Sequence, residues 1–500
     1  MGFDASVISG VVGFIETEFE LTRIQLGWSV ASLTLTATLA MMVAGPISDR
    51  LGRRPVLMAA AALFAVSAVY SALAPNFASL VIARMIGGFG VGAALIIAPM
   101  YIAEIAPASM RGRMVSFNQL NIVLGITAAF FSNYVILRLG QSGLAWVEAV
   151  GLDEWAWRWM LGIEGLPAII YLLALVFVPE SPRLLAMKGR DDEALAVFEK
   201  FGSGDASPEE TLAAVKQSID KSPESNKGSI GQLFGPAMRL VLTIGISVAI
   251  LQQITGINSV FFYAPMIFEQ SGVGTDASFM QAVLVGIVNL VFTIAAMLLI
   301  DRLGRRPLLG FGLAGITVCM FLLSYGFGSA TYVIDEEAIA AFPPEIERES
   351  LETLVGVEYA SDVEFRKAVS GAIGVAAFKE HESELVRGAV DLNSTLILLA
   401  ILGFVASFAI SLGPVMWVLF SELFPNQLRG LAISFAGLIN SAVSFGVQLV
   451  FPWELANLGN STTFLIYGVF AAIGFAFLMR ILPETKGRSL EELEHDLVKG

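Results

Sequence analysis

The heptad Asp49-Arg-Leu-Gly-Arg-Arg-Pro55 recurs, letter for letter, as Asp301-Arg-Leu-Gly-Arg-Arg-Pro307. Each copy follows a long apolar segment and precedes another one. A charged heptad repeated between apolar segments predicts a membrane protein that consists of two similar halves. We expect the functional site to lie where these halves meet.

The composition supports a membrane protein. Of 500 residues, 56% are hydrophobic and 15% are charged, with a mean hydropathy of +0.73, whereas soluble domains carry about 25% charged residues. None of the apolar segments alternates like a membrane barrel strand. The predicted fold class is therefore an all-α polytopic membrane protein whose transmembrane helices form two pseudo-symmetric six-helix bundles. We expect twelve helices, near 1–15, 28–47, 56–75, 79–102, 115–137, 159–179, 240–267, 279–300, 307–329, 394–420, 430–452 and 461–482.

The basic residues of the short loops predict the orientation. Lys and Arg gather after the even-numbered helices, at Arg50, Arg53, Arg54, Arg111, Arg113, Arg302, Arg305, Arg306, Arg429, Lys486 and Arg488. Loops rich in Lys and Arg remain in the cytoplasm. We therefore expect a multi-pass protein of the cell membrane with both termini in the cytoplasm.

Matching motifs in the two halves predict the domain boundaries. The first bundle spans residues 1–182, a cytoplasmic linker with short helices spans 183–237, and the second bundle spans 238–500. The offset between matching motifs rises from 252 residues at the heptads to 318 at the Glu104 and Glu422 motifs. This difference places an insertion at 331–391 on the outer side, where acidic residues outnumber basic ones by fourteen to five. We expect a solvated, partly helical cap, with an extracellular recognition role as the alternative and no nucleic-acid partner.

Little in the chain indicates an enzyme. The lone Cys319 excludes an intrachain disulfide and a cysteine-based metal site. No nucleophile–base pair or metal-ligand cluster is recognisable within the apolar segments. We expect no catalytic residue, no metal and no cofactor.

Three ionisable residues, Asp4, Arg84 and Glu164, fall within apolar segments rather than at their ends. A charge there costs about 2.5–3.5 kcal/mol on insertion scales and usually marks a transport pathway or a proton relay. A paired Asp and Arg can separate when the Asp binds a proton. The alternative is a static structural ion pair.

Seven motifs resemble the sugar porter family of the major facilitator superfamily, across nearly the whole chain. They are Gly45-Pro-Ile-Ser-Asp-Arg-Leu-Gly-Arg-Arg54, Arg84-Met-Ile-Gly-Gly-Phe-Gly-Val-Gly92, Pro99-Met-Tyr-Ile-Ala-Glu104, Pro179-Glu-Ser-Pro-Arg183, Gln252-Gln-Ile-Thr-Gly-Ile-Asn258, Gly413-Pro-Val-Met-Trp417 and Pro483-Glu-Thr-Lys-Gly487. The resemblance implies a secondary transporter that imports a monosaccharide by alternating access. It also implies about ten more apolar residues before Gly2, so we expect that the first helix is truncated in this sequence.

The resemblance bears on the coupling ion. Proton-linked members, which resemble bacterial xylose–proton symporters, have acidic and basic residues at the positions of Asp4, Arg84 and Glu164, whereas glucose facilitators carry Asn at the first position. It therefore implies proton symport. Alternatives are a proton-independent facilitator, a polyol or inositol transporter, or a non-transporting sugar sensor. We expect the chain to function as a monomer.

The sugar site is expected to consist of amide side chains and one indole. Amides both donate and accept hydrogen bonds, and an indole can stack on the C–H face of a sugar ring. The resemblance implies sugar contacts at Gln119, Gln252, Gln253, Asn258, Asn289, Trp417 and Asn440. Buried amides could also simply join helices. Phe262 and Tyr263 are implied as the outer gate; Phe262 stands where the family has Tyr, and pentose against hexose stays open.

Charged residues at the cytoplasmic ends of the helices are expected to form a gate. Ion pairs between the two bundles would close the cytoplasmic side, although exposed pairs are worth less than about 1 kcal/mol each. The alternative is that these charges only set the topology. The residues are Asp49, Arg53, Arg54, Glu104, Arg111, Glu180, Arg183, Asp301, Arg305, Arg306, Glu422, Arg429 and Glu484.

Overall fold

The computed structural model describes most of the chain. The described residues are 1–106, 110–201, 207–220, 230–342, 346, 348–425, 427–488 and 492–493. The side chains of Arg111 and eight other residues within these ranges are not described.

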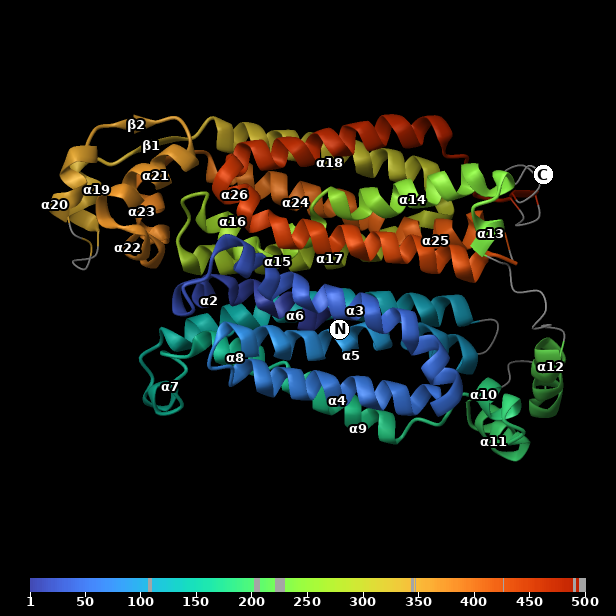
Figure 1. Cartoon of the computed structure of the whole chain (residues 1–500). Helices are drawn as coiled ribbons and strands as arrows, with labels where there is room; N and C mark the ends of the chain where they lie inside the picture. Colours follow the sequence, from blue (N-terminus) through green and yellow to red (C-terminus); the bar gives the residue numbers. More distant parts are fainter. Residues whose placement is uncertain are drawn as a thin grey trace.

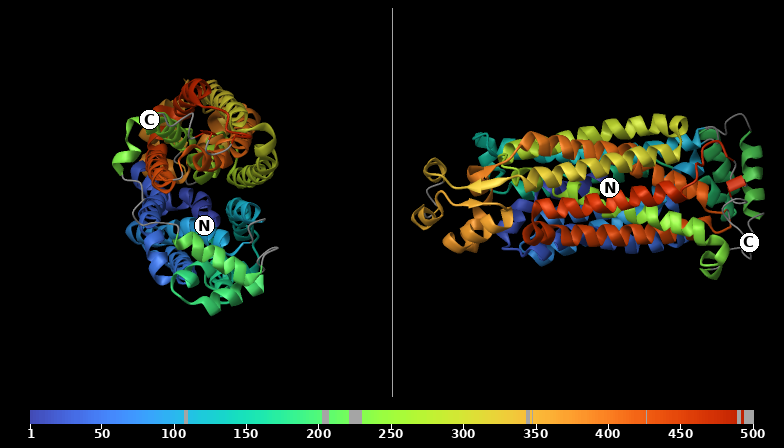
Figure 2. Two further views of the ribbon diagram at one scale, coloured as in Figure 1. Left: turned by 90° about the vertical axis from the view of Figure 1, so that its right-hand side faces the viewer. Right: turned by 90° about the horizontal axis from the view of Figure 1, so that it is seen from above.

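Long helices dominate both halves and lie roughly parallel to one another (Figures 1 and 2). The first half contains α1 (Gly2–Val7), η1 (Ile8–Gly10), α2 (Val12–Glu18), α3 (Arg23–Leu51), α4 (Arg53–Ala72), α5 (Phe77–Ile105), α6 (Arg111–Gly140), α7 (Ala145–Ala149), α8 (Ala156–Gly162) and α9 (Gly165–Val176). The second contains η3 (Pro236–Met238), α14 (Arg239–Ile254), α15 (Ile257–Phe262), α16 (Ala264–Glu269), α17 (Thr275–Leu303), α18 (Arg305–Gly328), α24 (Ser394–Ile410), α25 (Leu412–Leu423) and α26 (Arg429–Ile481).

Ten described helical segments are long and apolar enough to span a membrane. Two differences explain why ten segments qualify although twelve helices are expected. The 53-residue α26 covers two of them, because its Gly459 has the non-helical φ of 80° and divides it. The first helix consists of the short elements α1, η1 and α2, none of which qualifies by length. The fold is the expected all-α bundle.

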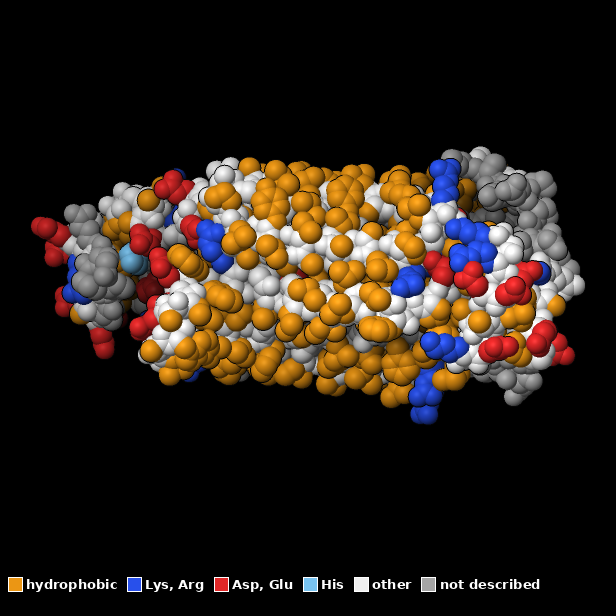
Figure 3. Space-filling model, turned by 90° about the horizontal axis from the view of Figure 1, so that it is seen from below, with side chains coloured by type: hydrophobic (Ala, Val, Ile, Leu, Met, Phe, Trp, Pro, Cys, Tyr) orange, Lys and Arg blue, Asp and Glu red, His pale blue; other side chains and the backbone are white. Residues whose placement is uncertain are grey.

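Apolar side chains cover the flank of the bundle, and charged side chains gather at its two ends (Figure 3). Exposed apolar residues include Leu39, Val69 and Phe311 on α3, α4 and α18. In water this belt would be unfavourable, whereas lipid tails solvate it. We call the end that carries both heptads the basic end and the opposite one the insert end.

The insert, residues 331–391, forms a small folded unit at the insert end (Figure 1). Its strands pair antiparallel in the order β2–β1–β3, and helices cover this sheet around a separate apolar core that includes Tyr332, Phe365 and Leu385. The elements are β1 (Thr331–Val333), α19 (Glu336–Ala341), α20 (Arg348–Leu351), η4 (Glu352–Leu354), β2 (Glu358–Tyr359), α21 (Asp362–Ile373), α22 (Val375–Glu380), α23 (Glu382–Ala389) and β3 (Val390–Asp391).

The linker between the halves lies at the basic end (Figure 1). Its described helices are α10 (Pro182–Met187), α11 (Asp191–Phe201), α12 (Pro208–Asp220) and α13 (Ile230–Leu233). The first three pack through a small apolar core that includes Leu185, Phe198 and Leu212.

The two heptads adopt the same structure in both halves. Gly52 and Gly304 have φ of 125° and 94° and separate α3 from α4 and α17 from α18. A Cβ at Gly52 would lie 2.3 Å from Glu180 Oε2, and one at Gly304 would lie 2.8 Å from Glu484 Oε2. Positive φ and this close approach together favour glycine. Each carboxylate accepts hydrogen bonds from the two backbone N–H groups that follow its glycine, which satisfies free donors at a helix N-terminus.

Candidate transport site

The structure brings together the three ionisable residues that the sequence places within apolar segments of the first half. Asp4, Arg84 and Glu164 are 2%, 1% and 4% exposed. Arg84 Nη1 lies 3.5 Å from Asp4 Oδ1 and donates a hydrogen bond of 3.0 Å to the backbone oxygen of Asp4. The carboxyl group of Glu164, at the junction of α8 and α9, interacts electrostatically with both. We call these residues the charged triad.

The charged triad has unsatisfied hydrogen-bonding capacity. The carboxyl groups of Asp4 and Glu164 lie within hydrogen-bonding reach of each other, a contact that needs a proton on one of them, and Arg84 Nε is buried without a hydrogen-bond partner in the structure. Structural ion pairs normally satisfy their buried polar atoms, so unsatisfied groups indicate a functional site. Gly87 of α5 leaves room for the group, because a Cβ there would lie 3.2 Å from Asp4 Oδ2.

Four of the predicted amides form one hydrogen-bonded cluster in the second half. Gln253 Nε2 donates to Gln252 Oε1 at 3.3 Å and to Asn440 Oδ1 at 3.2 Å. Asn440 Nδ2 donates to Gln252 Oε1 at 2.7 Å, and Asn258 Nδ2 donates to Gln253 Oε1 at 2.9 Å. We call Gln252, Gln253, Asn258 and Asn440 the amide cluster.

Breaks in two helices determine the position of the amide cluster. Gly256 separates α14 from α15 with a φ of 86°, and a Cβ there would lie 2.6 Å from the ring of Tyr467. Gln252 Nε2 donates to the carbonyl of Leu412 at 3.2 Å, where α24 ends and α25 begins. Interrupted helices with free backbone groups are typical of substrate sites in transporters.

The other predicted sugar contacts lie outside this cluster. Asn289 of α17 is 5% exposed, Gln119 of α6 is partly buried, and Trp417 of α25 is 49% exposed. The Trp417 ring makes an edge contact with Phe420, with 6.0 Å between the ring centroids. Its exposure leaves the ring free for a ligand.

Gln448 extends the amide cluster to the other half, although it was missed in the sequence. It is fully buried, its Nε2 donates to Ser444 Oγ at 2.7 Å, and Ser444 Oγ also accepts from Asn258 Nδ2 at 2.8 Å. Thr34 of α3 donates to Gln448 Oε1 at 2.9 Å. The signal was present, because Gln448 is also an amide within an apolar segment.

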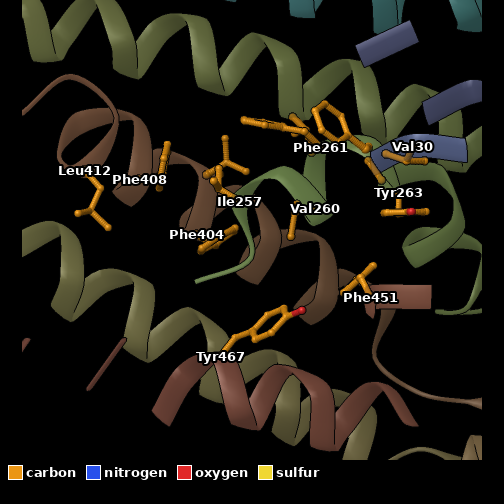
Figure 4. Close-up of a cluster of buried hydrophobic side chains, with 14 of the residues drawn as sticks. Val30, Ile257, Val260, Phe261, Tyr263, Phe404, Phe408, Leu412, Phe451 and Tyr467 are labelled. Atoms are coloured by element: carbon orange, nitrogen blue, oxygen red, sulfur yellow. The ribbon is translucent and has the colours of Figure 1, made fainter. Parts of the chain in front are cut away.

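The predicted outer gate packs beside Gln448. Tyr263 is fully buried, and its hydroxyl donates to the backbone oxygen of Gln448 at 3.1 Å. Its ring lies 5.3 Å from that of Phe451, and Figure 4 shows Val30 of the first half in the same cluster. Phe262 is 8% exposed in this core.

At the basic end, the predicted gate charges pair within each half. Arg53 bonds Glu104 and Asp49, with Nη distances of 3.1 and 2.6 Å. Arg305 repeats this pattern with Glu422 and Asp301, at 2.7 and 3.2 Å. The expected pairs between the bundles are not the ones found here.

The remaining gate residues have different surroundings. Arg54 and Arg306 donate to backbone carbonyls at the ends of α9 and α26, and Arg429 Nε donates to the backbone oxygen of Phe424. Arg183 is exposed. The side chain of Arg111 lies outside the described part of the structure.

The two halves contact each other toward the insert end. Trp28 and Phe445 have ring centroids 5.7 Å apart, and Arg138 pairs with Asp276 at 2.6 Å. A Cβ at Gly27 would lie only 1.9 Å from the backbone oxygen of Leu449. The conformation described here therefore has a closed insert end.

Comparisons with known proteins agree with this architecture. A family model described as "Sugar (and other) transporter" matches residues 2–342 and 368–497, leaving 343–367 of the insert unmatched. An arabinose-proton symporter of Bacillus subtilis is 34% identical over 100% of this chain and 92% of its own length. A D-xylose-proton symporter of Escherichia coli is 33% identical over 99% of this chain and 92% of its own.

Solved structures also match. The inward-open conformation of the xylose transporter from Escherichia coli aligns with a TM-score of 0.74 at 32% identity, covering 99% of this chain and 96% of that one. The same symporter bound to 6-bromo-6-deoxy-D-glucose aligns with a TM-score of 0.68 at 32% identity and the same coverage. Among the residues that the structure describes, no group of three or more His, Cys, Asp or Glu is placed to hold a metal ion. The chain therefore belongs to the sugar transporter family, and its activity is transport across a membrane rather than catalysis.

Proposed function

We propose that this transporter imports a monosaccharide together with a proton by alternating access. The observation that carries the proposal is the buried charged triad in the first half, which Tyr263 of the second half connects to Gln448 beside the amide cluster. Two carboxyl groups and one guanidinium carry a net negative charge when all are ionised. One bound proton makes the buried group neutral, which reduces the cost of burying it.

We propose that the basic end faces the cytoplasm, because Lys and Arg in short loops favour that side. The end of α26 then lies on the cytoplasmic side, and the protein spans the cell membrane. The closed insert end makes this conformation one that faces inward. The site lies within a single chain, which supports a functional monomer.

The proton acts through the ion pair between Asp4 and Arg84. With the insert end open, Asp4 binds a proton from outside and its attraction for Arg84 weakens. Sugar then binds between the amide cluster and Trp417, with Gln119 and Asn289 as further contacts. Closure of the insert end opens the basic end, and the sugar leaves before the proton does.

The sugar hydroxyls replace hydrogen bonds that the amide cluster now makes internally. Gln252, Gln253 and Asn440 bond one another in a loop. A hydroxyl group that donates and accepts can enter this loop without leaving an amide unsatisfied. This exchange suits a neutral polyhydroxylated substrate. A pentose, a hexose or a polyol would each fit this chemistry.

The basic-end networks are proposed as the inner gate. Asp49, Glu104 and Arg53 form one cluster, and Asp301, Glu422 and Arg305 form the other. Since they pair within their own halves when the basic end is open, pairs between the halves are expected only in the opposite conformation. Two further contacts hold each cluster in place. Glu180 and Glu484 bind the first backbone N–H groups of α4 and α18, and Arg54 and Arg306 bind backbone carbonyls at the ends of α9 and α26.

Transport by purified protein in proteoliposomes tests the proposal. We expect wild-type protein to accumulate a labelled monosaccharide from a panel of pentoses, hexoses and inositol when a pH gradient is imposed. Asp4→Asn is expected to keep sugar exchange and to lose uphill uptake. Gln253→Ala is the control, because it should weaken sugar binding in both assays. Exchange by wild-type protein without accumulation would instead establish a proton-independent facilitator.

A further inference from the structure

The insert is fixed to the second half of the protein. It continues directly into α18 and α24 at its two ends. Asp362 Oδ2 also accepts hydrogen bonds from the backbone N and the side-chain Nδ2 of Asn460 at 3.3 and 3.0 Å. A Cβ at Gly459 would lie 2.7 Å from Asp362 Oδ1. The insert and the second half therefore move together.

The insert also forms direct contacts with the first half. Arg23, the first residue of α3, places Nη2 3.2 Å from Glu382 Oε2 at the start of α23. Lys379 Nζ of α22 donates to the backbone oxygen of Leu21 at 2.7 Å. These contacts join two halves that must separate when the insert end opens.

Neighbouring charges hold Arg23 and Glu382 in place. Arg23 Nη1 also pairs with Glu16 Oε1 at 2.8 Å, and Glu382 also pairs with Arg366 inside the insert. The Arg23 and Glu382 side chains are only 18% and 19% exposed. By contrast, a second ion pair between the halves, Arg138 with Asp276, has side chains that are 54% and 44% exposed. Shielding from water strengthens the first pair relative to the second.

The contact between Arg23 and Glu382 lies beside a half-open pocket at the insert end. A cavity of about 470 Å³ is lined by Phe14 of the first half, by Met266 and Phe279 of the second, and by Ser383 of the insert. Arg23 and Glu382 line the same cavity. The insert is thus one of its walls, and the cavity exists only while all three parts are together.

We propose that the insert is a latch on the gate at the insert end, and that Arg23 and Glu382 are positioning residues that set the balance between its closed and open states. The proposal rests on the alternating access proposed above. Opening the insert end carries Glu382 away with the second half and leaves Arg23 behind. A contact present in only one of two conformations shifts their equilibrium by its own free energy.

Distances between spin labels across the insert end measure this balance. Ser142 of the first half and Ser329 of the second are exposed there. Both can be labelled as cysteines after Cys319→Ser, because Cys319 is the only cysteine of the chain. The full-length protein is placed in lipid nanodiscs, and the ratio of long to short distances reports the ratio of open to closed molecules.

We expect Glu382→Gln and Arg23→Gln each to raise the open-to-closed ratio about fivefold or more. The double variant should be less than additive, because both single changes remove the same contact. Asp276→Asn, which removes the exposed pair, should change the ratio by about twofold or less. Lys367→Gln is the control, since it removes an exposed charge of the insert on α21 and leaves Glu382 with both Arg23 and Arg366.

Three results would overturn the latch: unshifted distances in both single variants, full additivity in the double variant, or an equal shift in Lys367→Gln. Labelled-sugar exchange on the same proteins separates this failure from a failure of the proposed function. Exchange with unshifted distances overturns the latch alone. Shifted distances in a protein that exchanges no sugar of the panel support the latch and count against the proposed substrate.

Discussion

Removing the hydroxyl of Thr34 should open the insert end. Thr34 Oγ1 donates to Gln448 Oε1 at 2.9 Å, from α3 of the first half to α26 of the second. Thr34→Val keeps the branched shape of the side chain and removes only the donor. Gln448 then keeps its hydrogen bond to Ser444 but loses the partner of its oxygen.

The burial of Gln448 decides the size of the effect. If water could replace Thr34 in the closed state, the loss would be that of an ordinary hydrogen bond, about 0.5–1.5 kcal/mol. Gln448 is 0% exposed, so its oxygen is left without a partner. An unsatisfied buried acceptor costs about 1–3 kcal/mol. When the halves separate, water reaches this oxygen, so the cost falls on the closed state and the open-to-closed ratio should rise about 5- to 150-fold.

The spin-label pair at Ser142 and Ser329 measures this ratio. Thr38→Val is the matched control: Thr38 lies one turn along α3, and its hydroxyl donates to the backbone oxygen of Thr34 within the same helix. We expect little change in the control. An equal response of the two variants would refute the reasoning, because the effect would then come from α3 itself and not from the contact between halves.

Three further predictions concern glycines and one carboxyl group. Gly27→Ala should prevent closure of the insert end and abolish the transport cycle, because its Cβ would lie 1.9 Å from the Leu449 backbone oxygen; labelled-sugar exchange measures this, with Gly446→Ala, which meets open space, as the control. Gly304→Ala should lower the midpoint of thermal unfolding, because φ of 94° with ψ of 165° is a region that essentially only glycine adopts, which costs an L-residue about 1–3 kcal/mol, and because the new Cβ displaces Glu484. Gly45→Ala, which has open space around it, should not. Glu269 is the last residue of α16, outside the apolar spans. Burial raises the pKa of its carboxyl group to about 7; a hydrogen bond with Thr275 lowers this pKa, and the nearby carboxylates of Glu382 and Glu384 raise it. Because the closed state holds this proton, its stabilisation is complete below pH 4.5 and lost as the pH rises through about 7. The open fraction should therefore rise between about pH 6 and 8 in wild-type protein, and it should rise less over this range in Glu269→Gln, which keeps only the pH dependence of the charged triad.

The sequence was sufficient to predict the structure wherever that structure depends on residues close together in the chain. Helices follow from apolar segments of adequate length, and the two identical heptads adopt matching structures because Gly52 and Gly304 meet the same local demands. The charged triad and the amide cluster were also predictable, since polar side chains are costly in apolar helices and must find one another.

Contacts that depend on the docking of separate parts could not be predicted in this way. Nothing near Glu382 in the sequence distinguishes it from the other acidic residues of the insert, and its partner Arg23 lies 359 positions away. The pairing of Arg53 with Glu104 joins α4 to α5, which lie 51 positions apart at these residues. One sequence must encode both conformations, so a list of charges alone does not tell in which of them each pair forms.

The two halves share the same arrangement of helices but differ in what changes the free-energy cost of burying their polar residues. The first half holds charges, Asp4, Arg84 and Glu164, whose burial cost changes with one proton. The second holds neutral amides, whose cost changes with the hydroxyl groups of a ligand. Tyr263 lies between the two sets, since it interacts with Arg84 electrostatically and bonds the backbone of Gln448. In the proposed mechanism, a proton at the charged triad and a sugar at the amide cluster would both act on the interface that closes the insert end, and coupling requires only that each lowers the free-energy cost of the same closed state.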